Sequence, residues 1–276
     1  MDRRYLEVTV KISKEDEEAL LGLLSLFGID SLWIQVEDEN VVVKGYADPL
    51  FVNRIYELKD AVYNRVGDCE FEIKSIMEED WESVWKKEYE PVSVSELIEI
   101  APPWFTQKDG RIFIKPGKAF GTGYHPTTYL CLKAISEYVS PGDYVLDVGS
   151  GSGILSVAAA YLGARSFGVE IDEIAIQEAI ENARLNKVGD RCSFLRGDLL
   201  TAISYPFALI VANILTPVVV LMIPDVKRNL RKGGYFLASG IMSAEKELVL
   251  RELDSNGFIV DEILSEGEWV CIVSTT

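Results

Sequence analysis

A glycine-rich segment carries the clearest chemical signal of the sequence. It runs over residues 145–153, where three glycines alternate with serines shortly after an acidic residue. Glycine lets the backbone turn sharply and leaves no Cβ in the way of an approaching ligand. A second acidic residue lies 21 residues after the first glycine, at the end of the next predicted strand, where a carboxylate can accept hydrogen bonds from both hydroxyls of a ribose. The segment therefore predicts a site for a nucleoside-containing cofactor, with Asp147, Gly149, Gly151, Gly153 and Glu170 as its binding residues.

Two kinds of cofactor are compatible with a glycine-rich turn after a strand. A dinucleotide-binding fingerprint has the spacing GxGxxG, and its third glycine packs the helix against the strand. Here the third position is Ile154 or Ser156, depending on the starting glycine, and Asp147 stands where the dinucleotide pattern usually has an apolar residue. The pattern DxGxGxG, with an acid ending the next strand, resembles the S-adenosylmethionine site of class I methyltransferases. Acidic groups there favour the positively charged sulfonium and amino groups.

A second polar segment, residues 120–128, precedes these strands and reads FGTGYHPTT. Its two glycines and its proline predict an ordered turn that leads into a helix over 129–135. Thr127 or Thr128 then lies at the helix start, where a hydroxyl and exposed backbone N–H groups can bind a carboxylate. The alternative is that the threonines only cap the helix. His125 could act as a base, but a single histidine in a loop favours a structural role, which we expect.

Asn213 ends the strand predicted over 207–212. In a doubly wound sheet, this strand end is next to the glycine-rich turn. An amide there can orient the amine of a substrate, and the alternative is a turn-forming asparagine. We predict the substrate role, with Phe120 and the turn at 214–215 as apolar walls around a neutral amine. We expect no dedicated general base, because in-line alignment of the amine with the methyl group can supply the rate.

The elements that must hold these residues alternate between strand and helix after Pro141. Helices are predicted over 154–162, after a capping Asp172 and over 217–230, and Gly233-Gly234 turns the chain. Buried apolar runs predict strands over 144–148, 166–170, around Phe194, over 207–212 and over 235–239. This alternation indicates an α/β fold with a doubly wound, Rossmann-like parallel sheet.

The first 77 residues predict a smaller α+β domain. Alternating segments indicate strands over 5–12, 32–36, 41–46 and 70–76, and helical spacing indicates helices after Ser13 and from Pro49 to about residue 66. The order βαββαβ is typical of a ferredoxin-like fold. Trp81 and Trp85 then lie four residues apart, on one face of a short helix that we expect to pack between domains.

Composition excludes several classes of protein. Of 276 residues, 48% are hydrophobic and 26% are charged, which is typical of a folded globular protein. No apolar run reaches the roughly 18 residues of a membrane span, and we recognise no signal peptide. We therefore expect a cytoplasmic protein with no membrane partner and four free thiols. With a single histidine and no CxxC pair, no metal site is predicted.

The net charge of −17 is unevenly distributed. Residues 1–80 hold 9 basic and 19 acidic residues, whereas residues 81–276 hold 18 and 25. Because nucleic-acid binding requires clustered positive charge, we expect none. The acidic front domain can attract a basic partner by long-range steering, although the same charge can serve solubility alone.

Together these motifs resemble those of the bacterial PrmA family. The resemblance rests on FGTGYHPTT, VLDVGSGSGILSVAAAYLGA, VANIL at 211–215, LASGI at 237–241 and EWVCI at 268–272, and WESVWK at 81–86 and IEIAPPW at 98–104 resemble the family's linker. It implies methylation of the large-subunit ribosomal protein numbered eleven, at lysine side chains and the N-terminal amine, with S-adenosylmethionine as cofactor. It also implies cofactor contacts at Thr128, Gly149, Glu170 and Asn213, although many members have aspartate in place of Glu170.

The resemblance implies three parts of the chain. Residues 1–77 hold the substrate, residues 78–100 connect, and residues 101–276 form the methyltransferase domain. We expect a monomer with a basic ribosomal protein as its partner. The alternatives are another protein or a small-molecule amine as acceptor, a nicotinamide-dependent oxidoreductase, and a non-catalytic binding module. The missing third glycine argues against the oxidoreductase, and the complete set of polar residues around the glycine-rich segment argues against the binding module.

Overall fold

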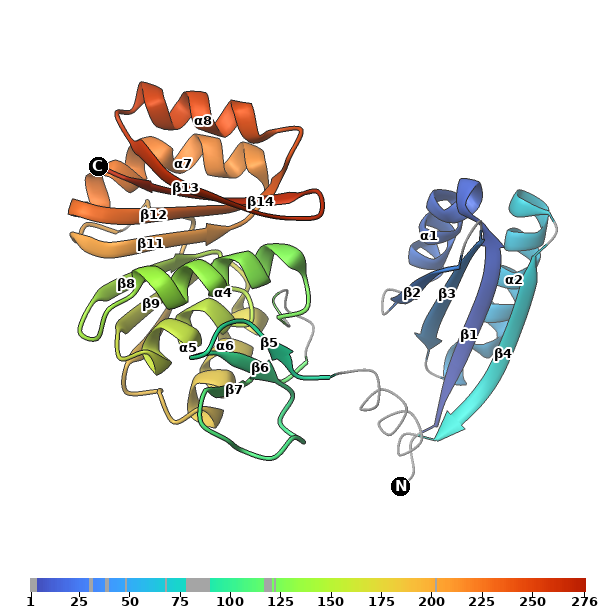
Figure 1. Cartoon of the computed structure of the whole chain (residues 1–276). Coiled ribbons are helices and arrows are strands. Elements are labelled where there is room, and N and C mark those ends of the chain that lie inside the picture. The colour runs from blue at the N-terminus through green and yellow to red at the C-terminus, as the bar shows by residue number, and fades with distance from the viewer. Residues whose placement is uncertain are drawn as a thin grey trace. The chain divides into compact units, whose positions relative to one another are not determined.

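The chain folds into two compact units, residues Met1–Glu88 and Tyr89–Thr276, shown in Figure 1. The computed structural model describes residues 4–29, 32–37, 40–47, 49–67, 69–77, 90–116, 121, 123–201 and 203–276. Phe120 and residues 78–89 of the predicted connector, including Trp81 and Trp85, lie outside the described residues. Within the described ranges, none of the helices is both long and apolar enough to cross a bilayer.

The first unit has the predicted order βαββαβ. Its four strands pair antiparallel in the order β2-β3-β1-β4, so the two central strands are those that begin the two βαβ halves. This arrangement confirms the ferredoxin-like prediction. A short 3-10 turn precedes each helix, Lys14–Asp16 before the first and Pro49–Phe51 before the second. The elements are β1 (Arg4–Ser13), α1 (Glu17–Leu26), β2 (Leu32–Glu37), β3 (Asn40–Ala47), α2 (Val52–Val66) and β4 (Glu70–Met77).

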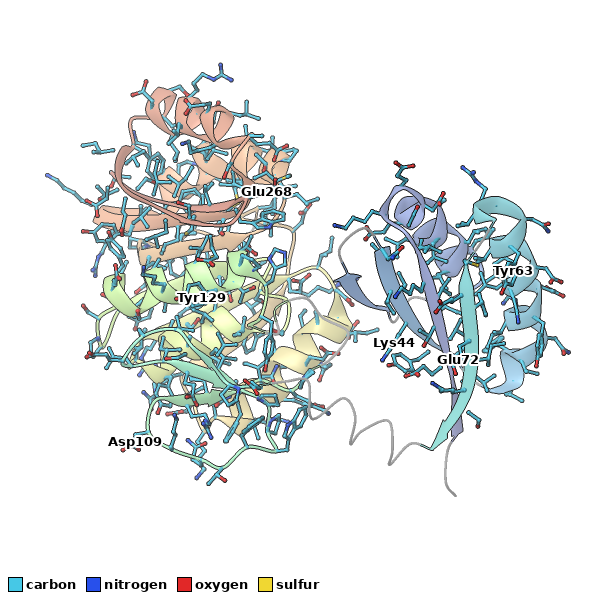
Figure 2. All side chains as sticks on the ribbon, turned by 45° about the vertical axis from the view of Figure 1, so that its right-hand side comes forward. Lys44, Tyr63, Glu72, Asp109, Tyr129 and Glu268 are labelled. Carbon is cyan, nitrogen blue, oxygen red and sulfur yellow. The ribbon has the colours of Figure 1, made fainter. Side chains whose placement is uncertain are left out.

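Alternation along β1 separates the two faces of this small sheet. Val8 and Val10 are fully buried in a core with the apolar positions of α1 and α2. Thr9, between them, points to the other face, where its register partners are Lys44 on β3 and Glu72 on β4. Both charged side chains project from strands, away from the helices (Figure 2). Helices therefore cover only one face of the sheet.

The second unit is built on a seven-stranded sheet in the order β10-β9-β8-β11-β12-β14-β13. The first five strands in this order are parallel, and β14 pairs antiparallel with both of its neighbours. The five predicted parallel strands are confirmed. The strands are β8 (Tyr144–Val148), β9 (Arg165–Glu170), β10 (Cys192–Arg196), β11 (Phe207–Asn213), β12 (Leu230–Met242), β13 (Ile259–Glu266) and β14 (Trp269–Thr275).

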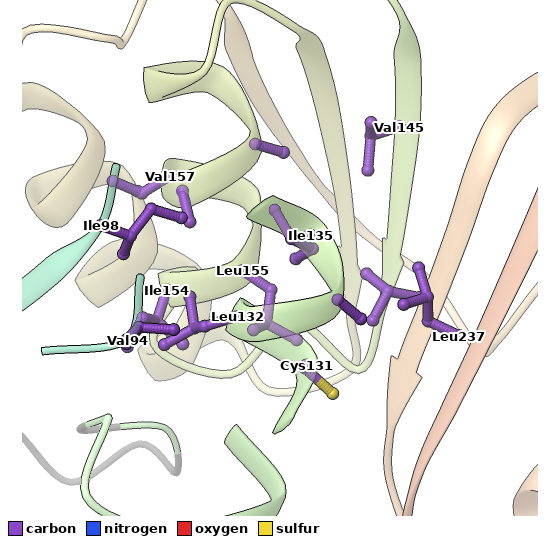
Figure 3. Packing of buried hydrophobic residues seen from close by; sticks show 14 of the residues in the cluster. Val94, Ile98, Cys131, Leu132, Ile135, Val145, Ile154, Leu155, Val157 and Leu237 are labelled. Carbon is purple, nitrogen blue, oxygen red and sulfur yellow. The ribbon is translucent and has the colours of Figure 1, made fainter. Parts of the chain in front are cut away.

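Helices cover both faces of this sheet (Figure 1). One core cluster joins α4 and α5 to the sheet; it includes Leu132, Leu155 and Val145, and part of it is shown in Figure 3. A second cluster joins α7 and α8 to the opposite face. The predicted cap at Asp172 is present, because its carboxylate accepts the N–H of Ile174 at 2.9 Å. The helices are α4 (Pro126–Tyr138), α5 (Ile154–Tyr161), α6 (Glu173–Leu185), α7 (Thr216–Asn229) and α8 (Lys246–Ser255).

Three features differ from the sequence-based expectations. Residues predicted as the second half of the connector form strands of a small sheet in the second unit, composed of β5 (Val92–Ser93), β6 (Glu99–Ala101) and β7 (Arg111–Phe113). The glycine pair at 233–234, predicted as a turn, lies inside β12. The pairing of β12 with β11 is irregular there, because Phe207 pairs with Leu230 but Leu209 pairs with Tyr235. Helix α8 and the hairpin β13–β14 had no predicted counterpart.

Candidate active site

The carboxyl ends of the parallel strands surround a cavity of about 640 Å³. This location is where open α/β sheets bind ligands, and the volume suits a nucleoside with an attached side chain. Five predicted site residues line it: Thr128, Gly149, Gly151, Glu170 and Asn213. The other lining residues are Gly121, His125, Thr127, Ser150, Ile154, Leu155, Val169, Ile171, Asp172, Ala175, Gly197, Asp198, Leu199, Ile214, Leu215, Val218, Gly240 and Trp269.

The glycine-rich loop follows β8 and opens α5. Gly149 has a φ of 72°, and a Cβ on it would lie 2.6 Å from Cγ2 of Ile214, which follows the neighbouring strand β11. Gly153, with a φ of 76°, is the N-cap of α5 and does not line the cavity. A Cβ on Gly153 would lie 2.7 Å from Cβ of Ala179 on α6. Gly153 thus allows close packing against α6, as the third glycine of a dinucleotide fingerprint allows helix–strand packing.

Glu170 ends β9 and turns its carboxylate toward the loop. Its Oε2 accepts the N–H of Gly151 at 2.9 Å, and its Oε1 accepts the N–H groups of Ile171 at 2.8 Å and Asp172 at 3.1 Å. These bonds fix the carboxylate at the cavity wall in one orientation. Each carboxylate oxygen has about two acceptor sites, so Oε1 is saturated by its two N–H groups and Oε2 can accept one further donor, such as a ligand hydroxyl.

Asp147 lies behind the cavity and does not line it. It is fully buried, and its Oδ2 accepts the N–H of Ser156 at 3.0 Å and the hydroxyl of Ser156 at 2.8 Å. Burial raises the pKa of this carboxyl group to about 7, against the lowering effect of the Ser156 bonds, and the charge of Glu170 adds to the rise. Asp147 therefore ties the strand before the loop to the first turns of α5.

Thr128 and Asn213 meet at the other side of the cavity, although 85 residues separate them. Nδ2 of Asn213 donates to Oγ1 of Thr128 at 3.3 Å. Thr128 lies in the first turn of α4, and Asn213 ends β11 opposite Ser239 of β12. The hydroxyl of Ser239 donates to the carbonyl of Thr127 at 3.3 Å, which joins α4 to the sheet at this point. The predicted threonine and asparagine therefore form one polar wall.

His125 is the N-cap of α4. Its Nδ1 accepts the N–H of Thr127 at 3.3 Å and lies 2.8 Å from the hydroxyl of the same residue. Burial lowers the pKa of the imidazole, which favours the neutral form that such an acceptor needs. The ring also packs edge-on against Trp269, with centroids 5.0 Å apart at 67°. These contacts give His125 a structural role at the edge of the cavity.

Several lining residues were missed by sequence reasoning. Asp198 and Leu199 follow β10, and Leu199 has an unusual φ of 49° for a residue with a side chain. The only signal for them was their place after the third parallel strand, since no glycine motif marks this end. Trp269 comes from β14, which had no predicted counterpart; the motif EWVCI around it carried the family resemblance but predicted no site residue.

The glycine-rich loop, the fixed acid at the end of the next strand and the polar wall suit an S-adenosyl group better than a pyrophosphate. A parallel sheet that ends in an antiparallel hairpin, together with this site, defines the class: a Rossmann-like, S-adenosylmethionine-dependent methyltransferase.

Comparison with known proteins defines the family. The sequence matches "Ribosomal protein L11 methyltransferase (PrmA)" over residues 4–276. Proteins named ribosomal protein L11 methyltransferase from Listeria innocua and Geobacillus kaustophilus are each 39% identical over 251 residues, which cover 86% of this chain and 80% of theirs. The chain therefore belongs to the ribosomal protein L11 methyltransferase (PrmA) family.

Solved structures agree with this placement. A ribosomal protein L11 methylase from Lactobacillus delbrueckii subsp. bulgaricus is 32% identical with a TM-score of 0.64, and the match covers 68% of this chain and 98% of that one. A methyltransferase from Pyrococcus furiosus shares only the fold, with 16% identity and a TM-score of 0.51 over 59% of this chain and 88% of that one.

Proposed function

We propose that this chain transfers methyl groups from S-adenosylmethionine to amines of ribosomal protein L11, namely lysine side chains and the N-terminal amine. The observation that carries the proposal is the cavity itself. It brings Thr128 and Asn213 together opposite the glycine-rich loop and Glu170, in a chain that matches the family over residues 4–276. We further propose that the chain acts as a monomer in the cytoplasm, where newly made ribosomal proteins are found.

The residues around the cavity fit the cofactor in distinct ways. Glu170 accepts a ribose hydroxyl through Oε2, and the loop backbone at Gly149 and Gly151 leaves room for the amino acid part. At the start of α4, the hydroxyl of Thr128 receives a carboxylate, because the backbone N–H groups of Thr127, Thr128 and Tyr129 already donate to His125. S-adenosylmethionine supplies an electrophilic methyl group on a positively charged sulfur. The three groups together hold the ribose and the amino acid part of such a molecule.

Apolar side chains near Asn213 suit the binding of a neutral amine. Lysine has a reference pKa of about 10.4, so its neutral form costs about 5 kcal/mol at pH 7. Ile214, Leu215 and Trp269 line the cavity next to Asn213, and apolar surroundings disfavour the ammonium form. Asn213 uses Nδ2 for Thr128, and within the described part of the chain no hydrogen bond engages its Oδ1. Asn213 Oδ1 thus accepts an N–H of the neutral amine and aims its lone pair.

The role of Asn213 is tested by single-turnover methylation with saturating cofactor. We expect Asn213→Ala to lower the rate about 10²-fold, because alignment of the amine is lost. His125→Ala should lower it less than about tenfold, and should lower stability by about 1 kcal/mol through loss of the cap on α4. The reverse order of the two rates would show that His125 is a general base and would contradict the alignment mechanism.

A further inference from the structure

Two asparagines, one in α6 and one at its C-cap, bind backbone groups of distant segments, and the proposed mechanism uses neither of them. Asn182 is 1% exposed, and Asn186, the C-cap, follows one turn later. Neither residue lines the cavity. Buried amides that bond to other segments fix those segments in place, because breaking such a bond leaves a buried polar group without a partner.

Asn182 joins the glycine-rich loop to the segment that follows β7. Its Nδ2 donates to the carbonyl of Ser152 at 2.9 Å, and its Oδ1 accepts the N–H of Lys115 at 3.0 Å. The hydroxyl of Ser152 in turn donates to the carbonyl of Gly121 at 2.6 Å, and Gly121 lines the cavity. Asn182 and Ser152 therefore link α6, the loop and the segment that carries Gly121.

The bond from Asn182 acts on the peptide group at the centre of the loop. The carbonyl of Ser152 accepts from Asn182, while the N–H of the next residue, Gly153, donates to the carbonyl of Ser150 at 2.8 Å. Both sides of this peptide group are thus held. Two residues before Gly153, the N–H of Gly151 donates to Oε2 of Glu170 at 2.9 Å. Three glycines make the loop intrinsically permissive, so external bonds must select its conformation.

We infer that Asn182 is a positioning residue for the cofactor: it presets the glycine-rich loop in its binding conformation and couples the loop to the backbone at Lys115. This inference rests on the proposed function. Asn186 is the matched comparison, because its amide accepts the N–H of Phe113 at 2.8 Å and donates to the carbonyl of Phe113 at 2.6 Å. Asn186 thus holds the same neighbouring segment but makes no bond to the loop.

The inference is tested with Asn182→Ala, Asn182→Asp and Asn186→Ala. Both changes at Asn182 remove the donor to the loop, and the aspartate keeps the acceptor for Lys115. We expect both to raise the Kd and the KM for S-adenosylmethionine about tenfold, with kcat changed less than about twofold. Asn186→Ala should lower thermal stability but change the Kd less than about twofold. Calorimetric titration and thermal unfolding of each variant measure these quantities.

A measurement on the wild-type protein does not depend on how the variants fold. If Asn182 couples the loop to Lys115, S-adenosylmethionine should slow hydrogen exchange of the Lys115 amide more than that of the Phe113 amide. Equal slowing, or equal Kd values for the Asn182 and Asn186 variants, would overturn the inference. Failure of the wild-type protein to bind S-adenosylmethionine would instead overturn the proposed function, so the two failures are distinguishable.

Discussion

At the scale of single residues, Glu170 is an acid that is bonded to the backbone of the protein and also lines the cavity. Its carboxylate accepts three backbone N–H groups, one from the loop and two from its own turn. These bonds orient both oxygens before a ligand arrives, so little ordering remains to be done on binding. A carboxylate that only bound a ligand would not require backbone N–H partners on both of its oxygens.

Replacing Glu170 tests this assignment directly. Glu170→Gln keeps the shape but replaces one acceptor oxygen with a donor, so a ribose hydroxyl and a backbone N–H lose their partner. We expect the Kd for S-adenosylmethionine to rise about 10- to 100-fold in calorimetric titration. Glu173→Gln is the control, because Glu173 forms only an exposed ion pair with Arg196 at 3.7 Å and lies outside the cavity. Equal affinities for both variants would contradict the ribose contact.

Thermal shifts of the wild-type protein and of Glu170→Gln separate two classes of cofactor. S-adenosylmethionine should raise the Tm of the wild-type protein, and a nicotinamide dinucleotide should not. The shift should become smaller in Glu170→Gln at equal ligand concentration. A shift with the dinucleotide alone would favour an oxidoreductase.

The buried carboxyl group of Asp147 gives stability a defined pH dependence. Burial raises its pKa to about 7 in the folded state, against about 4 in an unfolded chain. The folded state therefore binds the proton more tightly, and the stabilisation is complete below about pH 4 and is lost as the pH rises through about 7. The full change is of the order of 4 kcal/mol.

Asp147→Asn provides the reference for this titration, because asparagine resembles the protonated carboxyl group at every pH. We expect the free energy of unfolding of the wild-type protein to fall relative to this variant between pH 4 and pH 8. Urea unfolding at several pH values measures the difference. Parallel pH profiles for the two proteins would contradict the raised pKa.

At the scale of elements, the turn after β11 depends on β12. Gly240 has a φ of 79°, and a Cβ on it would lie 2.2 Å from the carbonyl oxygen of Ile214. This contact is with the backbone, so a flexible side chain cannot relieve it. Ile214 directly follows Asn213, and its N–H donates to the carbonyl of Ser239 at 3.3 Å. Gly240 thus allows two strands to meet at the polar wall of the cavity.

Gly240→Ala should therefore lower both stability and activity. We expect a loss of about 2–4 kcal/mol from steric overlap and backbone strain, and a lower methylation rate because Asn213 moves. Gly233→Ala is a matched control on the same strand, because Gly233 also has a positive φ of 69°, but a Cβ on it would meet no atom within 4 Å. It should cost about 1 kcal/mol and leave the rate unchanged. Thermal unfolding and single-turnover rates compare the two.

The elements that sequence patterns predicted are those whose signal is local. Runs such as 207–212 are apolar throughout because both faces of the strand are covered, and capping residues such as Asp172 mark the helix starts. The hairpin β13–β14 escaped prediction because β13 is a half-exposed edge strand with acidic residues, and its place is set by pairing with β14. Strands β5–β7 have only two or three residues each, too few for a periodic pattern.

The residues of the candidate site also fall into those with a local sequence signal and those without one. Gly149, Gly151 and Glu170 were predictable because a single turn and the next strand end contain them. Asp198 and Trp269 were not, because only the completed sheet brings their strands to the cavity. The supporting position of Asp147 also depends on tertiary structure, since its burial and its bond to Ser156 decide which way the carboxylate points.

At the scale of the whole molecule, the two units have separate hydrophobic cores, and the first part of the chain has the larger acidic excess. The first unit has its own buried cluster, and the second has two clusters, one on each face of its sheet. Every lining residue of the cavity lies between positions 121 and 269. Residues 1–80 hold 19 acidic and 9 basic residues. The cavity is thus lined by residues of the second unit alone, and the proposal that the first unit holds a basic substrate is supported by its acidic excess.

Removing the first unit should therefore separate cofactor binding from recognition of the protein substrate. A chain of residues 89–276 should unfold cooperatively and bind S-adenosylmethionine within about twofold of the full chain, because its cores and cavity are intact. It should methylate ribosomal protein L11 at least about 10²-fold more slowly, yet methylate a short lysine peptide as fast as the full chain does. Raising the salt concentration from about 0.05 to 0.5 M should slow methylation of the protein by the full chain, since screening weakens long-range attraction. The peptide reaction should change little with salt. Equal methylation of the protein by both chains would show that residues 1–88 do not recognise it, whatever their charge.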